Sequence, residues 1–107
     1  MVKLLVAEGA DITVADNYGS TPLHTASSSG HVEVVKLLVD EGAAKSVADS
    51  DGRTSLLAAS SNGHVDVVKL LVAERADITV ADSDGRTPLF AASLNGHIEV
   101  VLSLIHI

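Results

Sequence analysis

Gly30-His31-Val32-Glu33-Val34-Val35 returns as Gly63-His64-Val65-Asp66-Val67-Val68 and once more as Gly96-His97-Ile98-Glu99-Val100-Val101. Each copy starts 33 residues after the one before it, and the segments 16–48 and 49–81 are identical at 20 of 33 positions. A constant period of this length is typical of one supersecondary unit stacked on copies of itself. The sequence therefore predicts a repeat solenoid in place of a single globular core.

The composition narrows the class of protein. A net charge of −7 argues against a nucleic-acid partner, because binding phosphates requires clustered Lys and Arg. The chain has no Cys, which excludes disulfides and thiolate metal sites. No apolar run approaches the length of about 18 residues that a membrane span needs, and the first residues do not form a signal peptide. We expect no membrane partner and an intracellular, cytoplasmic protein, with the nucleus as the open alternative.

The third copy shows how the unit is built. Asp82-Ser83-Asp84-Gly85 is typical of a turn, and Thr87-Pro88 is a favourable start for a helix because Thr caps free amides and Pro suits the first turn. The spacing predicts a short helix over 89–95, ended by Gly96, and a second helix from about His97. In the middle copy, the apolar face of that second helix consists of Val65, Val68, Leu71 and Val72.

Thr21-Pro22-Leu23-His24-Thr25-Ala26 matches the signature T-P-L-H-x-A at every specified position. With the period of 33, the chain resembles the ankyrin repeat family from residue 1 to about residue 101. The resemblance implies an all-α repeat solenoid of stacked helix-turn-helix units with projecting β-hairpin-like loops. We expect one domain over 1–107: a partial repeat with only a second helix (1–15), repeat one (16–48), repeat two (49–81) and repeat three (82–107).

Several positions depart from the pattern. Leu57 and Phe90 replace the His of the signature, which in the family is structural and bonds back to the Thr, so we expect repeats two and three to exchange this bond for apolar contact. Arg75 replaces Gly42, and a left-handed backbone at that place would cost a non-glycine residue about 1–2 kcal/mol. Lys45 puts a charge where Ile78 stands. We expect repeat two to be the weakest layer.

The two ends of the chain look incomplete. Residues 1–6 align with 34–39, inside a second helix, and no polar cap precedes them. We expect a piece of a longer array, with marginal stability and self-association through the open layers.

The last six residues, Leu102-Ser103-Leu104-Ile105-His106-Ile107, break the repeat. Ser103 falls at a core Leu position and Leu102 at an exposed Lys position, which would invert the amphipathic pattern. The codons CTG TCT CTT ATA CAC ATC, a transposon end used in sequencing-library adapters, translate to the same residues. We hypothesise that 102–107 are adapter-derived; the alternative is a divergent final helix.

The candidate chemical sites favour structural interpretations. His31, His64 and His97 recur in layers about 8–10 Å apart, whereas zinc ligands lie about 2 Å from the metal, so we expect structural histidines and no metal. The turn at 49–52 lacks the glycine and glutamate spacing of a calcium loop. Because no nucleophile elbow, P-loop or dinucleotide fingerprint occurs, we expect neither enzyme activity nor a cofactor.

The surface remains as the candidate site. In the ankyrin family, partners dock on loop tips and on the exposed side of the first helices. We expect a protein partner there, contacted by Asn17, Tyr18, Ser20, Ser28, Ser29, Ser50, Asp51, Arg53, Ser61, Asn62, Ser83, Asp84, Arg86, Leu94 and Asn95. Tyr18 is the one large amphipathic side chain among them, a type that favours interface hot spots. The alternative function is a sensor or regulatory arm of a larger signalling enzyme whose catalytic domain lies outside this chain.

Overall fold

The computed structural model describes residues 15–43 and 45–106. The partial repeat expected over 1–15 therefore lies outside the described residues, apart from Ala15. The described part holds six helices in three pairs. The first helices of the pairs are α2 (Pro22–Ser29), α4 (Ser55–Ser61) and α6 (Pro88–Leu94). The second helices are α3 (Val32–Asp40), α5 (Val65–Ala73) and α7 (Ile98–Ile105).

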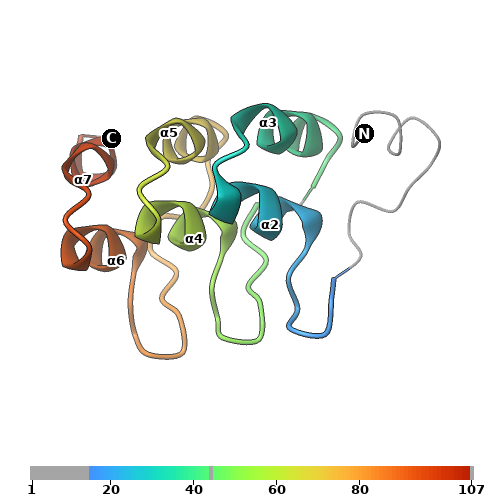
Figure 1. Cartoon of the computed structure of the whole chain (residues 1–107), viewed down its shortest axis with the longest axis horizontal. Helices are drawn as coiled ribbons and strands as arrows, with labels where there is room; N and C mark the ends of the chain where they lie inside the picture. Colours follow the sequence, from blue (N-terminus) through green and yellow to red (C-terminus); the bar gives the residue numbers. More distant parts are fainter. Residues whose placement is uncertain (1–14, 44, 107) are drawn as a thin grey trace.

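The helices form two layers, and each pair packs on the next. The first helices contact one another in the order α2, α4, α6, and the second helices do so in the order α3, α5, α7. Figure 1 shows the two layers, with three loops that extend from the first-helix layer to the same side of the molecule. Since no helix pair has a core of its own, the predicted repeat solenoid is confirmed.

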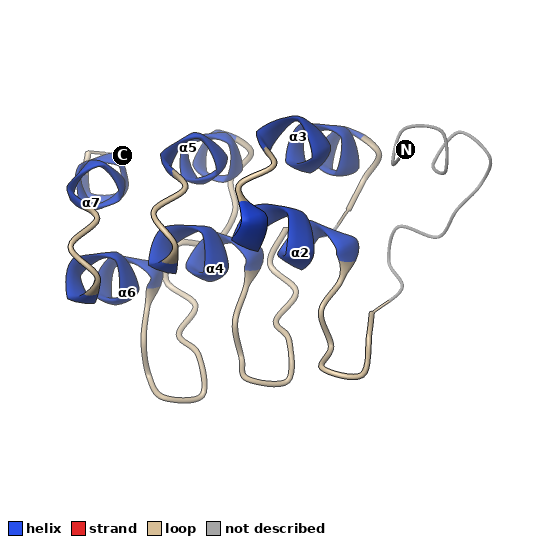
Figure 2. Cartoon of the chain, viewed as in Figure 1, coloured by secondary structure: helices blue, strands red, loops and turns tan. Residues whose placement is uncertain are grey.

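The loops lack the β-hairpin part of the expectation. No residue in the described ranges is in a strand, as Figure 2 shows. Each loop is closed by one backbone hydrogen bond across its base, for example from Asp49 N–H to the Arg53 carbonyl at 2.9 Å. One such bond with an intervening turn is too short to make a ladder, so the β-hairpin character of these loops is not confirmed.

Threonine starts every first helix. Thr21, Thr54 and Thr87 are the N-cap residues, and each side-chain oxygen accepts a hydrogen bond from the backbone N–H three residues later. Pro22 and Pro88 fit the first helical positions, where no backbone donor is lost. The short helix predicted for repeat three is therefore confirmed, shifted by one residue at each end.

The second helices carry most of the core. Val68 and Leu71 are fully buried, as their helical spacing predicts, and Val65 and Val72 pack on the core from its edge. The sequence interpretation missed Val67, which is only 1% exposed. Because α5 packs against both α4 and its neighbours in the second layer, its apolar face is wider than a single stripe.

Two departures from the repeat pattern, one in repeat two and one at the end of repeat one, have the expected geometry. Arg75 has a φ of 66°, so it keeps the left-handed backbone of Gly42 at a non-glycine residue. Lys45 is half-buried, and its counterpart Ile78 packs against the core. Repeat two thus contains one strained residue, and the end of repeat one carries a charged residue where repeat two has an apolar one.

Two expectations for repeat three are wrong. Phe90 gains no apolar cover: it is 52% exposed, whereas Leu57 is 3% exposed because α6 lies against α4. The amphipathic pattern of α7 is not inverted. Leu104, at the place of Leu71, is buried, and Ser103 satisfies its hydroxyl by donating to the Glu99 carbonyl at 2.9 Å.

None of the helices in the described ranges has the length and apolar character needed to cross a membrane.

Candidate binding surface

An aspartate shapes each projecting loop. Asp49 Oδ1 accepts hydrogen bonds from the Asp51 and Arg53 amides, both at 2.9 Å. Asp16 and Asp82 make the same pair of bonds in their own loops. A carboxylate that accepts from residues two and four positions later forms an Asx-type turn, which fixes the backbone without a ladder. The three tips therefore share one conformation; their side chains are the same in repeats two and three and differ in repeat one.

The tips are also joined to one another. Ser50 N–H donates to the Tyr18 carbonyl at 2.8 Å, and Ser83 N–H donates to the Asp51 carbonyl at 2.9 Å. These bonds run from one repeat to the next at the far edge of the loops. The loops consequently form a continuous row, and a partner would meet a surface that is already ordered.

Most side chains predicted for partner contact are open to solvent. Tyr18 is 73% exposed and Leu94 is 61% exposed. The other exposed residues of the set are Asn17, Ser29, Ser50, Asp51, Arg53, Asn62, Ser83, Asp84, Arg86 and Asn95, and Ser20, Ser28 and Ser61 are half-buried. The fold brings the loop residues into one row and places the first-helix residues at the ends of α2, α4 and α6.

Arg53 and Arg86 lie where the loops meet the first helices. Their backbones are fixed by Asp49 and Asp82, and within the described residues neither guanidinium has a carboxylate within 4.0 Å. Arg53 lines a hollow of about 280 Å³ together with Ser28 and other residues of repeats one and two. The guanidiniums are therefore available to carboxylates or carbonyls of a ligand.

The C-terminal ends of the first helices are hydrogen-bonded to the next repeat, which the sequence did not reveal. The Ser28 carbonyl accepts from Asn62 Nδ2 and from His64 Nε2, both at 2.9 Å. One repeat later, the Ser61 carbonyl accepts from Asn95 Nδ2 at 2.8 Å and from His97 Nε2 at 2.9 Å. The repeated Asn and His thus satisfy the last carbonyls of the preceding first helix. This confirms the structural interpretation of His64 and His97 and extends it across the repeat boundary.

His24 has a second bond besides the expected one. Its Nδ1 accepts from Thr21 N–H at 3.0 Å, so Nε2 carries the proton and donates to the Arg53 carbonyl at 3.0 Å. The imidazole is 4% exposed. His24 therefore closes its own helix cap and joins repeat one to the loop of repeat two.

The sequence analysis did not identify the small residues that line the hollows between the loops and the first helices. Ala58, on α4, lines the 280 Å³ hollow and also a smaller one of about 80 Å³ that reaches Arg86 and Ala91. Small side chains at these places leave room between the loops and the first helices. The sequence does contain a sign of these hollows. The residue four positions after each cap threonine is small: Thr25, Ala58 and Ala91.

The ionisable side chains of the described residues do not gather into a metal-binding cluster. Within the described ranges, no three side chains of His, Cys, Asp or Glu converge as metal ligands would. The Thr79 hydroxyl donates to Asp77 Oδ1 at 2.7 Å, and this bond, supported by the Thr79 amide, lowers the pKa of the Asp77 carboxyl. Asp77 lies outside the loop row, so the shift has a local structural cause.

The fold and this surface define a helical repeat protein that presents a row of ordered loops. The family described as "Ankyrin repeats (3 copies)" matches residues 1–82 and again 46–107, which together span the chain. The chain belongs to the ankyrin repeat family. Proteins of this family are in general modules for protein–protein interaction and are typically non-catalytic. No curated protein matches the chain significantly.

Proposed function

We propose that this chain is a non-catalytic interaction module that binds a protein partner with its loop tips and the exposed side of its first helices. The observation that carries the proposal is the loop row: three tips of one conformation, hydrogen-bonded from one repeat to the next, whose side chains are mostly exposed. A surface whose loops are already ordered loses little conformational entropy on binding.

The chemistry of the row limits the kind of partner. Arg53 and Arg86 occupy matching places, Asp51 and Asp84 lie beside them at the tips, and Tyr18 takes the tip of repeat one. The partner surface should therefore pair its own carboxylates with the arginines and offer a pocket or flat apolar area to Tyr18. If the chain is the regulatory arm of a larger enzyme, the same row would contact that enzyme.

Site-specific photocrosslinking tests the proposal. A photoreactive residue at position 18, 50 or 83 should capture the same protein in cell extract, and unlabelled chain should compete. The control positions are Lys69 and Glu33, which are exposed on the second helices. The purified captured protein should then bind Tyr18→Ala at least tenfold more weakly, as for a central aromatic contact. Equal capture at the control positions, or unchanged affinity of Tyr18→Ala, would contradict the proposal.

A further inference from the structure

Two of the three asparagines in the chain are followed directly by glycine, as Asn62-Gly63 and Asn95-Gly96. Each asparagine is the C-cap residue of a first helix, α4 or α6, and each is exposed to solvent. Asparagine before glycine is chemically labile, because the glycine has no side chain to shield the backbone nitrogen that attacks the amide. Both pairs therefore have the sequence that spontaneous deamidation requires.

Deamidation is a substitution at the side-chain carbonyl carbon of the asparagine. At Asn62, the Gly63 nitrogen loses its proton and bonds to Asn62 Cγ, the bond from Cγ to Nδ2 breaks, and ammonia leaves. Water then opens the resulting succinimide ring. Breaking the bond between Cγ and the Gly63 nitrogen gives aspartate, and breaking the bond between the backbone carbonyl carbon and that nitrogen gives isoaspartate. One water is consumed and one ammonia is released, with no change of oxidation state.

The folded backbone keeps the reacting atoms apart. Asn62 has a ψ of 0°, which eclipses the Gly63 nitrogen with the Asn62 nitrogen and turns it away from Cβ, whereas ring closure needs it on the Cβ side. Asn95 has the same geometry, with a ψ of 2°. The Gly63 N–H also donates to the Ser60 carbonyl at 3.3 Å. Ring closure therefore requires a change of backbone conformation at the end of the first helix.

The preceding repeat holds the amide that must react. Asn62 Nδ2 donates to the Ser28 carbonyl at 2.9 Å and to Ser28 Oγ at 3.1 Å, and His64 donates to the same carbonyl. Asn95 Nδ2 is bound to the Ser61 carbonyl at 2.8 Å. The amide has to leave these acceptors before its carbon can turn toward the glycine nitrogen. The reaction is consequently coupled to local opening of the boundary between two repeats.

We propose that Asn62 and Asn95 are deamidation sites that the stacking of repeats suppresses, and that deamidation stops an opened boundary from closing fully. The product carboxylate has no hydrogen to donate to the Ser28 carbonyl, and it lies at the negative, C-terminal end of α2. Isoaspartate also adds a carbon to the backbone, which displaces His64 from the same carbonyl. Each boundary that opens is therefore marked by an added negative charge.

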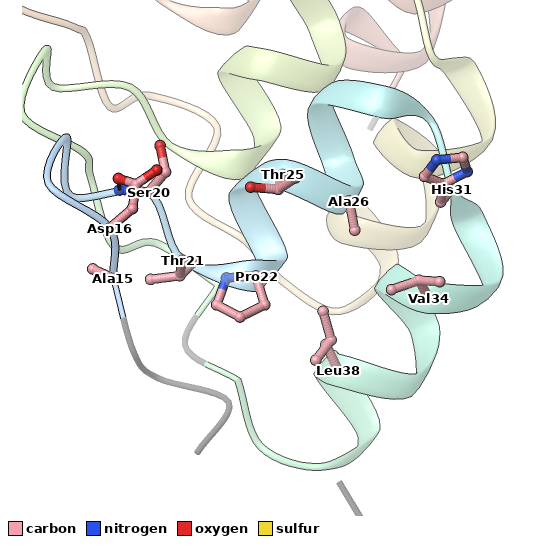
Figure 3. Close-up of a pocket in the computed structure, with 10 residues that line it drawn as sticks. All are labelled: Ala15, Asp16, Ser20, Thr21, Pro22, Thr25, Ala26, His31, Val34 and Leu38. Atoms are coloured by element: carbon pink, nitrogen blue, oxygen red, sulfur yellow. Dashed lines mark hydrogen bonds between the residues drawn. The ribbon is translucent and has the colours of Figure 1, made fainter. Parts of the chain in front are cut away.

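Repeat one supplies a natural comparison. It reads Ser29-Gly30-His31 where repeat two reads Asn62-Gly63-His64, and Figure 3 shows His31 in the turn between α2 and α3. Serine has no amide to lose, so Asn62→Ser removes the reaction with a residue that this place in the repeat already carries. Asn17 serves as the second comparison, because the bulky Tyr18 follows it.

Peptide mapping of the full chain by mass spectrometry tests the proposal. Trypsin cleaves after Lys and Arg, which places Asn17, Asn62 and Asn95 on the separate peptides 4–36, 54–69 and 87–107. In urea, 54–69 and 87–107 should gain the mass that replaces an amide by an acid, and 4–36 should react much more slowly. Without urea, both reactive peptides should convert at least about tenfold more slowly, because only opened boundaries react.

Two pairs of variants test the role of the boundary. His64→Ala removes one bond to the Ser28 carbonyl and should speed conversion at Asn62 in the folded chain. Glu41→Ala, at an exposed position after α3, should leave the rate unchanged. Asn62→Asp, one product of the reaction, should unfold at a lower urea concentration than Asn62→Ser, since both lose the amide donor but only Asp adds a charge at the end of α2.

Three outcomes would overturn the proposal: no conversion of 54–69 and 87–107 in urea, equal conversion with and without urea, or equal urea midpoints for Asn62→Asp and Asn62→Ser. The comparison of rates uses the unchanged chain, so it stands even if Asn62→Asp fails to fold. The proposal goes beyond the proposed function, and no partner enters these measurements. Its failure is therefore distinct from failure of the partner surface.

Discussion

The imidazole of His97 lies against Gly63 so closely that a single added carbon on Gly63 would be 2.6 Å from Nδ1. The ring also donates to the Ser61 carbonyl at 2.9 Å. Stacking in this chain therefore depends on a glycine and a histidine that are 34 positions apart and come from successive copies of the same phrase. Gly96 has the same backbone, with φ 74° against 76° at Gly63, but within 15–43 and 45–106 no ring lies beside it.

Alanine substitutions at Gly63 and Gly96 separate the cost of a steric clash with the histidine ring from the cost of backbone strain. Alanine at either position bears the strain of a left-handed backbone, about 1–2 kcal/mol. Gly63→Ala must also displace the His97 ring, and we expect it to lose about 1–3 kcal/mol more than Gly96→Ala, the usual cost of overpacking. Urea unfolding at low protein concentration measures the difference. Equal losses would mean that the ring does not pack on Gly63.

Arg75 is the strained residue of repeat two, with φ at 66°. Arg75→Gly removes strain of about 1–2 kcal/mol and adds about 0.5–1 kcal/mol of chain entropy in the unfolded state, so stability should rise by up to about 1.5 kcal/mol. Gly42→Ala is the matched control, since Gly42 has φ 94° and open space around it. That variant should lose stability. If thermal unfolding showed that Arg75→Gly is less stable than the unchanged chain, the backbone at Arg75 would not be strained.

Ser60 has a fully buried hydroxyl with no hydrogen-bond partner among the described residues, and Ser93 is the exposed residue at the same place in α6. Both changes to alanine gain the same helix propensity, about 0.5 kcal/mol. Ser60→Ala should gain about 1 kcal/mol beyond this, because it removes a desolvated hydroxyl. Chemical denaturation of the two variants gives the comparison. If Ser60→Ala were no more stable than Ser93→Ala, the hydroxyl would have to be satisfied in solution.

His24 joins two repeats through the Thr21 amide and the Arg53 carbonyl. His24→Leu leaves both groups without their partner and should cost about 1–3 kcal/mol, with faster hydrogen exchange at the Thr21 amide. The control is Phe90→Leu, at the matching but exposed place of repeat three, which should stay within about 0.5 kcal/mol. A stable His24→Leu protein with unchanged exchange would show that the bonds contribute little.

Asp77 should titrate below the ordinary aspartate range, because the Thr79 hydroxyl and amide bind its charged form. A lowered pKa in the folded state means that the stabilisation is complete above the unfolded pKa of about 4 and is lost as the pH falls through the folded value. Carboxyl carbon shifts in an NMR titration report this directly. In Thr79→Val, the Asp77 pKa should rise. An unchanged titration curve would exclude the hydroxyl as the cause.

The period of 33 predicted the layers, the helix order and the caps because these depend on local chemistry. Thr87 and Pro88 favour the start of a helix and Gly96 favours its end through local chemistry, so their neighbours in space did not need to be known. The left-handed Arg75 was predictable for the same reason, since its place in the repeat belongs to a glycine.

What the sequence could not show depends on the neighbouring layer. His64 was predicted to be structural, but its acceptor, the Ser28 carbonyl, belongs to another repeat. The exposure of Phe90 likewise follows from which helices lie beside α6 and not from its own residue type. For the binding surface, the exposed tips followed from the turn pattern, whereas the hydrogen bonds that join Tyr18 to Ser50 required the stacking geometry.

Nuclear Overhauser effects between ring and glycine protons test the stacked-layer fold most directly, since protons must lie within about 5 Å to give them. The account predicts cross-peaks from His64 ring protons to Gly30 and from His97 ring protons to Gly63, at a concentration where the chain is monomeric. It predicts none between α2 and α6, which are separated by α4. Strong contacts between α2 and α6 in the monomer, without the two histidine–glycine pairs, would contradict it.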